Sequence, residues 1–114
     1  MTMTRGEIYL VDLTGEVGAE QGGIRPAVIV QNDVGNKHSP TTMVCPMTSS
    51  SKKYLMPTHV ELTLADGVAR RSICLCEQIR TIDKSRIIKK LGEIKSPDVI
   101  AKLNNCVAIA AGLV

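Results

Sequence analysis

The sequence of 114 residues is poor in aromatic side chains: it has two tyrosines and neither tryptophan nor phenylalanine. Proteins that bind single-stranded nucleic acid commonly stack the bases on aromatic rings. A site for such a ligand in this chain would therefore read the bases mainly through polar groups. The side-chain amides of Gln21, Asn32 and Gln78 are suited to that purpose, because each both donates and accepts hydrogen bonds.

Several catalytic motifs are missing as well. The chain has no glycine-rich P-loop, no paired-carboxylate motif that holds a metal and no nucleophile elbow. Nucleotide hydrolysis, metal-dependent cleavage and acyl transfer thus lack their usual sequence motifs. Arginine, threonine, serine and histidine remain as candidates for catalysis, and we expect neither a metal nor another cofactor.

The four cysteines, Cys45, Cys74, Cys76 and Cys106, form no Cys-x-x-Cys pair, and with two histidines they lack the spacing of a zinc site. Cys74 and Cys76 are two residues apart in a strand-like segment, so their side chains should share one face. A redox pair is one interpretation. The interpretation that we favour is that the thiols are buried and act as small apolar side chains.

Long apolar segments and a secretory leader are also lacking. The longest apolar run, residues 107–113, is far shorter than the roughly 18 residues of a membrane-spanning helix. No charged and apolar leader precedes a cleavage site at the N-terminus. We therefore expect a cytoplasmic protein that does not enter a membrane.

The composition, with 44% apolar and 22% charged residues, is that of a soluble globular protein. The length predicts a single domain over residues 1–114. A chain this short buries a limited share of its surface, so a remaining apolar face would be covered by self-association. Size alone thus favours a dimer.

Charge is unevenly distributed along the chain. Residues 1–34 carry two basic and five acidic side chains, for a net charge of −3, whereas the other 80 residues carry twelve basic and six acidic ones, for +6. The basic part would attract a polyanion by releasing its counterions. An ordinary solvated surface explains the same distribution equally well.

Strand-forming residues dominate the first half of the chain. Residues 7–13, 27–31 and 42–47 predict β-strands. The segments between them, residues 14–23 with four glycines and residues 32–41, predict loops. Because no helix is expected between these strands, an antiparallel arrangement is favoured over a parallel one.

The second half predicts two more strands and a closing helix. The strands are residues 59–62 and 73–79, on either side of a turn at residues 65–67. The helix should begin with Ser96 as its cap and Pro97 in its first turn. Its apolar stripe comprises Val99, Leu103, Cys106, Ala110 and Leu113. The whole pattern predicts a mainly β fold with a C-terminal helix, a small SH3-like barrel.

Arg25 is the strongest candidate for a phosphate-binding residue. It follows Gly22 and Gly23 at the start of an apolar strand, which would hold the guanidinium beside a loop. The fork of donors on arginine fits two phosphate oxygens better than the point charge of lysine does. A surface ion pair with Glu20 or Asp33 is the alternative.

A cluster of hydroxyls, residues 48–51, follows the strand that ends at Met47. Thr48, the first of them, could donate a hydrogen bond to a phosphate, although a polar turn without function is an alternative. His38 and His59 could form an acid–base pair, but the sequence does not place them side by side. Metal-free RNA cleavage, in which the ribose 2'-hydroxyl attacks the phosphorus, needs removal of a proton, protonation of the leaving group and stabilisation of the added negative charge. Arginine and hydroxyl side chains are the candidates for the last of these.

Five motifs together resemble the MazF/PemK toxin family, especially its Gram-positive members. They are RGEIY at residues 5–9, EQGGIRP at 20–26, VQND at 30–33, PTHVE at 57–61 and EQIRTIDK at 77–84. They occur in the order and with the spacing of the family and cover nearly the whole chain. The resemblance therefore implies the PemK/CcdB-like toxin fold and a homodimer.

The resemblance further implies a toxin of a type II toxin–antitoxin system. Such an mRNA interferase cleaves single-stranded RNA at specific sequences, without the ribosome or a metal, and leaves a 2',3'-cyclic phosphate and a 5'-hydroxyl. The family's catalytic arginine falls on Arg25 and its catalytic threonine on Thr48. The expected partner is a MazE-like antitoxin whose C-terminal segment blocks the RNA groove. Cys74 and Cys76 stand where relatives usually carry aliphatic residues.

The resemblance also implies a set of RNA-binding residues along the groove. They belong to two loops and two isolated positions: Glu20, Gln21, Gly22, Gly23, Asn32, Ser49, Ser50, Lys52 and Gln78.

Two alternatives share the predicted fold. A CcdB-like toxin binds gyrase and cleaves nothing, but the tryptophan that typifies its C-terminus is absent from this chain. A non-catalytic RNA-binding barrel is the other alternative.

Overall fold

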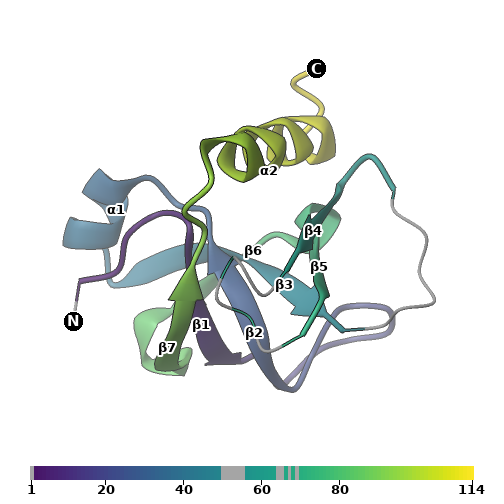
Figure 1. Ribbon diagram of the computed structural model, residues 1–114. Coiled ribbons are helices and arrows are strands. Elements are labelled where there is room, and N and C mark those ends of the chain that lie inside the picture. Colours follow the sequence, from purple (N-terminus) through teal and green to yellow (C-terminus); the bar gives the residue numbers. More distant parts are fainter. Residues whose placement is uncertain (1, 50–55, 64–65, 67, 69) are drawn as a thin grey trace.

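A computed structural model describes residues 2–49, 56–63, 66, 68 and 70–114 (Figure 1). The described chain is compact and nearly isometric, with extents of 35 × 32 × 31 Å. Its elements in chain order are β1 (Glu7–Asp12), β2 (Ile24–Ile29), α1 (Asp33–His38), β3 (Thr41–Thr48), β4 (His59–Leu62), β5 (Ser72–Leu75), η2 (Cys76–Gln78), β6 (Arg80–Asp83), η3 (Lys84–Arg86), β7 (Ile87–Glu93) and α2 (Pro97–Ala110).

The strands form one curled antiparallel sheet in the order β4-β5-β3-β2-β1-β7, and β6 pairs with β3 off this path. The expectation of a mainly β fold with a C-terminal helix is thus confirmed. The path of described strands runs from β4 to β7 without closing, so the fold is barrel-like rather than a closed barrel. The strands β6 and β7 were not located from the sequence.

The strand β3 lies at the centre of the sheet because it pairs with three others. On one edge, Val44 to Pro46 pair with β2. On the other edge, its first half pairs with β6 and its last two residues pair with β5. Met47 lies opposite Cys74 of β5, and Val44 lies opposite Arg80 of β6. Met47 and Val44 are three residues apart in β3, whereas their partners are six residues apart. The three extra residues are the 3-10 turn η2, which interrupts the strand predicted over residues 73–79.

Alternating side chains of the central strands bury two cores, one on each face of the sheet. In β2, Val28 belongs to one core, whereas Ala27 and Ile29 belong to the other. The helix α2 covers the first core, to which it contributes Leu103 and Cys106. Burying both faces compensates for the scarcity of large aromatic side chains, because many medium-sized apolar groups leave water.

The segment between β2 and β3 was predicted to be a loop, and this prediction was wrong over residues 33–38. They form the helix α1, whose cap is Asn32: its side chain accepts a hydrogen bond from the Gly35 amide at 2.8 Å. Asparagine is among the residues preferred at this position. This helix could not be recognised from the sequence, because it is short and contains a glycine and therefore has no apolar periodicity.

The C-terminal helix begins as predicted. The Ser96 side chain accepts a hydrogen bond from the Val99 amide at 3.4 Å, and Pro97 is the first helical residue. Leu103 and Cys106 are buried, but Leu113 lies beyond the last helical residue and is 76% exposed, so its place in the stripe was wrong. None of the described helices is long and apolar enough to cross a membrane.

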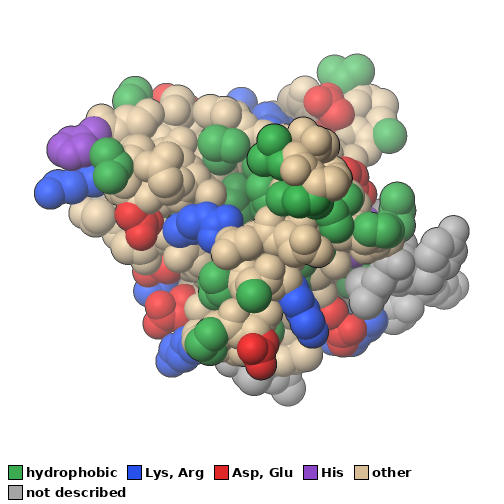
Figure 2. Space-filling view, turned by 90° about the horizontal axis from the view of Figure 1, so that it is seen from above, with side chains coloured by type: hydrophobic (Ala, Val, Ile, Leu, Met, Phe, Trp, Pro, Cys, Tyr) green, Lys and Arg blue, Asp and Glu red, His purple; other side chains and the backbone are tan. Residues whose placement is uncertain are grey.

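Figure 2 views the molecule from the side covered by α2. Hydrophobic side chains are exposed near the middle of this face, and side chains of both charge signs are intermixed around them. The positive excess of the later residues does not form a basic surface here, so a binding site for a polyanion has to be sought on another face.

Candidate active site

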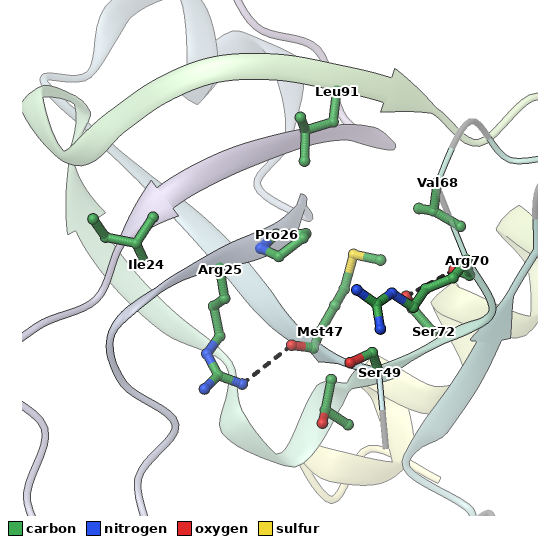
Figure 3. Close-up of a pocket in the computed structure, with 10 residues that line it drawn as sticks. Ile24, Arg25, Pro26, Met47, Ser49, Val68, Arg70, Ser72 and Leu91 are labelled. Atoms are coloured by element: carbon green, nitrogen blue, oxygen red, sulfur yellow. Dashed lines mark hydrogen bonds between the residues drawn. The ribbon is translucent and has the colours of Figure 1, made fainter. Parts of the chain in front are cut away.

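A cleft of about 760 Å³ lies beside the end of β3 (Figure 3). Four segments line it: the start of β2, the end of β3, the residues that lead into β5, and the strand β7. The lining residues are Ile24, Arg25, Pro26, Met47, Thr48, Ser49, Val68, Arg70, Ser72 and Leu91. The structure thus brings Arg25, Thr48 and Ser49 into one cavity, although Thr48 is 23 positions after Arg25 in the sequence.

Hydrogen bonds hold the Arg25 side chain at the edge of this cleft. Its Nε donates to the Gly22 carbonyl at 2.7 Å, and its Nη1 donates to Gln21 Oε1 at 2.5 Å and to the Met47 carbonyl at 3.3 Å. The last contact joins β2 to the strand that ends at Thr48. The expected alternative, an ion pair with Glu20 or Asp33, is not formed by these described residues. Arg25 therefore keeps its full charge for a ligand.

The glycine-rich loop before β2 is fixed by its own side chains. Glu20 Oε1 accepts a hydrogen bond from the Val17 amide at 2.6 Å. Gly23 has a φ of 74°, which favours glycine, and its carbonyl accepts a hydrogen bond from the Leu13 amide at 2.9 Å. The loop thus presents Gln21 and Gly22 to Arg25, while the Glu20 carboxylate is used within the loop.

Gln78 connects the loop to the other edge of β3. Its Oε1 accepts a hydrogen bond from the Gln21 amide at 3.3 Å. Gln78 is the last residue of η2, the turn that shifts the register between β5 and β6. The register shift therefore places the Gln78 amide next to the loop before Arg25. Gln21 and Gln78, both predicted to bind RNA, thus lie side by side.

A second arginine lines the cleft, and the sequence analysis missed it. Arg70 and Arg25 enter the cleft from opposite sides, with Met47 and Ser49 between them (Figure 3). The neighbouring Arg71 is instead paired with Glu61, at 2.5 Å between Nε and Oε1. The described residues form no ion pair with Arg70. Two adjacent arginines were visible in the sequence, but only the fold decides which of them faces the cleft.

The two histidines do not form an acid–base pair. His38 ends α1, whereas His59 lies in β4 and is buried. His59 Nδ1 accepts from the Met56 amide at 3.2 Å, which leaves its Nε2 to donate to Glu77 Oε2 at 3.0 Å. Burial would raise the pKa of Glu77, but the hydrogen bonds from His59, the backbone and Thr58, together with the charge of His59, outweigh it, and the pKa lies below its ordinary value. His59 is thus a structural residue.

Most of the expected RNA-binding positions are not among the residues that line the cleft. Five of them belong to the loop before Arg25 or contact it, namely Glu20, Gln21, Gly22, Gly23 and Gln78. Asn32 caps α1, at the far side of β2 from Arg25. Ser50 and Lys52 lie outside the described residues, as do most of residues 49–55 and part of the turn predicted at residues 65–67. Ser49 lines the cleft.

All four cysteines are buried and free, as favoured from the sequence. Hydrogen bonds with Cys45 and Cys76, together with burial, raise the pKa of the Cys74 thiol. Hydrogen bonds from Cys45 and Cys74 lower the pKa of Cys76. These thiols line the core behind β3 rather than the cleft.

The chain resembles known proteins over almost its entire length. Residues 4–111 match the family of PemK-like, MazF-like toxins of type II toxin–antitoxin systems. The endoribonuclease MazF of Staphylococcus saprophyticus is 46% identical over 112 residues, which cover 97% of this chain and 92% of that protein. The endoribonuclease EndoA of Bacillus subtilis is 41% identical over 115 residues, covering 100% and 98%.

The fold agrees with these matches. A mycobacterial endoribonuclease, solved in complex with its cognate antitoxin, superposes with a TM-score of 0.80 at 27% identity, covering 98% of this chain and 97% of that one. These relatives are named as endoribonucleases, and the gyrase-binding alternative gains no support from them.

Proposed function

This chain belongs to the PemK-like, MazF-like toxin family of type II toxin–antitoxin systems, and from that premise we propose that it is an endoribonuclease that cleaves single-stranded RNA in the cleft beside Arg25 and Thr48. The observation that carries the proposal is the cleft itself, which holds two guanidinium groups and two hydroxyl side chains from β3 and its end. One domain, residues 1–114, contains the site.

Arg25 stabilises the charge that develops during cleavage. Attack on the phosphorus adds negative charge to the phosphoryl oxygens, and a fixed cation in a partly dehydrated cleft interacts with that charge more strongly than water does. The carbonyls of Gly22 and Met47 fix the guanidinium before the substrate binds. This preorganisation makes the stabilisation available without a reorganisation cost.

Thr48 orients the phosphate to be cleaved. It is the last residue of β3, half-buried, and it lines the cleft together with Ser49. A hydroxyl on a rigid strand can donate a hydrogen bond to a non-bridging oxygen in one fixed direction. We assign Thr48 to positioning and charge stabilisation, with Arg25 as its partner.

The reaction forms one bond to the phosphorus and breaks another. The 2'-oxygen forms a bond to the phosphorus as it loses its proton, and the bond from the phosphorus to the 5'-oxygen breaks as that oxygen takes up a proton. The products are a 2',3'-cyclic phosphate and a 5'-hydroxyl. Because arginine remains protonated far above neutral pH, we assign Arg25 to charge stabilisation and leave the general base unassigned.

Polar groups next to Arg25 read the bases. Gln21 and Gln78 are already hydrogen-bonded to each other, and the backbone of Gly22 and Gly23 allows a close approach by the RNA. Glu20 holds this loop in shape. The other members of the expected set, Asn32, Ser49, Ser50 and Lys52, are proposed as further RNA contacts.

The cleft is completed by a second copy of the chain. Ile24 is 61% exposed and Leu91 is 36% exposed, and both line the cleft. Apolar side chains left at the surface beside a polar site favour an interface. We propose a homodimer, which sedimentation at micromolar concentration would reveal; a fully active monomer would contradict it.

The antitoxin partner binds the same cleft. The similar mycobacterial toxin was solved with its cognate antitoxin. A disordered, acidic C-terminal segment would be attracted by Arg25 and Arg70 and would exclude RNA. Since its substrate is mRNA, the protein acts in the cytoplasm.

The test is cleavage of a long single-stranded RNA by the purified protein in the presence of EDTA. We expect fragments with 5'-hydroxyl ends that begin at a short common sequence, which sequencing of the ends identifies. Intact RNA, with the protein folded, would exclude the proposed activity.

Matched variants then assign the residues. Arg25→Ala and Thr48→Val should lose cleavage while keeping the circular dichroism spectrum of the parent. Arg71→Ala is the control, because Arg71 is exposed, is paired with Glu61 and lies outside the cleft. A loss of cleavage in the control as large as in Arg25→Ala would show that positive charge in general, not the cleft, is needed.

A further inference from the structure

Three thiols from two distant parts of the sequence converge in the core behind the cleft. The Sγ atoms of Cys45, Cys74 and Cys76 all lie within 4.8 Å of one another. None of the three residues has solvent-exposed surface. All remain free thiols in this arrangement. A cluster of three mutually adjacent sulfur atoms is more than the core needs for packing, since one aliphatic side chain fills the same space as a thiol.

The sheet register assembles this cluster. Cys74 lies in β5 opposite Met47 of β3, so Cys45 lies two residues away along the neighbouring strand. Cys76 is the first residue of η2, where the chain leaves the ladder. The turn keeps its sulfur on the side of the other two, and the Cys74 thiol also donates to the Cys45 carbonyl at 3.9 Å. Rigid backbone therefore holds all three donors.

The surroundings of the cluster contain soft donors and apolar groups. The buried neighbours in the same core include Val28, Val60 and Leu103. The fourth cysteine, Cys106, belongs to this core but not to the triad, and its thiol donates to the His59 carbonyl at 3.5 Å. Among the described residues, no carboxylate or imidazole joins the three sulfur atoms in a metal-binding group.

The size of the triangle fits a metal ion. A bond of about 2.3 Å from a metal to thiolate sulfur places three sulfurs around a trigonal ion about 4 Å apart. The observed separations of up to 4.8 Å need to shrink by less than about 1 Å each. Rotation about the side-chain torsions of cysteine can supply most of that movement.

The type and number of the sulfur ligands indicate which ion the site would bind. Thiolates favour soft ions such as copper(I) and zinc(II). Zinc in structural sites is almost always tetrahedral, with four ligands, whereas the triad supplies three. We propose that Cys45, Cys74 and Cys76 form a buried binding site for one copper(I) ion.

Binding is an exchange of protons for a metal and involves no electron transfer. Copper enters already reduced, each thiol that becomes a ligand releases its proton to the buffer, and sulfur–copper bonds replace the sulfur–hydrogen bonds. Because the site is buried, the ion enters during folding or a local opening. The site is independent of the proposed cleavage chemistry, although it adjoins Met47, whose carbonyl holds Arg25.

The experiment titrates the reduced, full-length protein with copper(I) under anaerobic conditions, against a chelator that competes for the ion. We expect one ion per chain, luminescence typical of a solvent-shielded copper(I)–thiolate centre, and an X-ray absorption spectrum with three sulfur neighbours at about 2.3 Å. The melting temperature should rise, because the fold holds the three thiols together and therefore binds the ion more tightly than the unfolded chain does. Equal amounts of zinc(II) should not displace the copper.

Variants of single thiols distinguish the triad from the core in general. Cys45→Ala, Cys74→Ala and Cys76→Ala should each lose the luminescence and the stabilisation by copper. Cys106→Ala should keep both, because Cys106 is also buried but lies outside the triad. The proposal would be overturned if only Cys106→Ala lost the luminescence, or if all three triad variants kept it. It would also be overturned if the protein bound zinc(II) in preference to copper(I). If a triad variant fails to fold, the sulfur count from X-ray absorption on the parent still decides it.

Discussion

Two polar clusters lie near opposite ends of β3, and they differ in what their side chains contact. The closed cluster, around Asn36, joins Gln31, Thr41, Thr42 and Lys84 by internal hydrogen bonds. The open cluster, around Arg25, joins Gln21, Gly22, Gln78 and Met47. Of these residues, Arg25 and Met47 line the cleft. Both clusters contain side-chain amides of the kind that bind RNA.

The difference lies in what remains available to a ligand. Asn36 is 1% exposed, and both ends of its side-chain amide are hydrogen-bonded within the protein. In the open cluster, Arg25 is only half-buried, and it adjoins a cavity of about 760 Å³. Side-chain amides are therefore used within the protein at one end of the strand, whereas at the other end they lie beside a cavity that a ligand can enter.

The largest expected effect comes from the open cluster, with the substitution Arg25→Lys. It keeps the charge but removes the fork of donors, so the cleavage rate should fall about 100-fold or more. The free energy of unfolding should change little. Single-turnover cleavage and urea denaturation measure the two quantities, and an unchanged rate would mean that charge alone is required.

The second effect comes from the closed cluster, with the substitution Asn36→Ala. The carbonyl of Gln31 and the hydroxyl of Thr42 lose their partner, and leaving buried polar groups unpaired costs about 1–3 kcal/mol. Cleavage per folded molecule should stay the same. A specific loss of cleavage in this variant, at a temperature where it is fully folded, would erase the distinction between the clusters.

Arg70→Ala tests how far the open cluster extends. Because Arg70 lines the cleft, we expect its charge to attract the RNA backbone. Its loss should then raise KM several-fold, leave kcat nearly unchanged and lower the salt dependence of RNA binding by about one phosphate contact. The matched variant Arg71→Ala should do none of these. Equal effects of the two variants would mean that Arg70 acts as part of a diffuse surface charge.

A third polar group lies between β1 and β7. It tests whether polar side chains that bond only within the protein affect stability and not cleavage. Glu7 accepts hydrogen bonds from the Thr4 amide and the Tyr9 hydroxyl and pairs with Lys90 at 2.6 Å. Burial would raise the pKa of Glu7, but the Lys90 and Thr4 hydrogen bonds outweigh it and the pKa lies below the ordinary value of 4.5. The carboxylate therefore stabilises the fold above that value, and this contribution is lost as the pH falls through the lowered pKa.

Glu7→Gln should consequently reduce the free energy of unfolding at neutral pH by about 1 kcal/mol. The parent and the variant should converge in strongly acidic solution, because the parent carboxylate is then protonated. Urea denaturation as a function of pH measures this. A difference that persists in acid would show that packing, rather than charge, is responsible.

The smallest effect is expected for Asn32→Ala, at the residue that follows Gln31 of the closed cluster. Loss of the α1 cap should cost about 1 kcal/mol or less, given that the helix has six residues. If the RNA groove reaches this position, KM rises as well. A filter-binding assay with the cleavage substrate separates the two results and decides whether Asn32 joins the open cluster.

Local sequence was enough to predict the parts of the fold that short-range interactions control. The strand His59–Leu62 and the start of α2 at Pro97 follow from alternation and capping, and both are observed. The helix α1 was missed because six residues with a glycine carry no apolar period. The strand β6 was hidden, since residues 73–79 read as a single strand until η2 breaks it.

The chemical character of the site could also be predicted from the sequence. The absence of metal and nucleotide motifs left arginine and hydroxyls, and Arg25 and Thr48 do line one cleft. Which further residues join them could not be predicted, because Arg70 and Arg71 are chemically identical neighbours. Only the position of the chain before β5 directs one into the cleft and the other toward Glu61.

The sequence by itself determined the residue types, the strand-rich pattern and the family, because these depend on local order along the chain. Tertiary structure alone decided which side chains meet. The register shift at η2 places Gln78 beside the Arg25 loop and gathers Cys45, Cys74 and Cys76 into one triangle. The physical reason is that strand pairing brings together residues far apart in sequence, and no local spacing encodes a distance across a sheet.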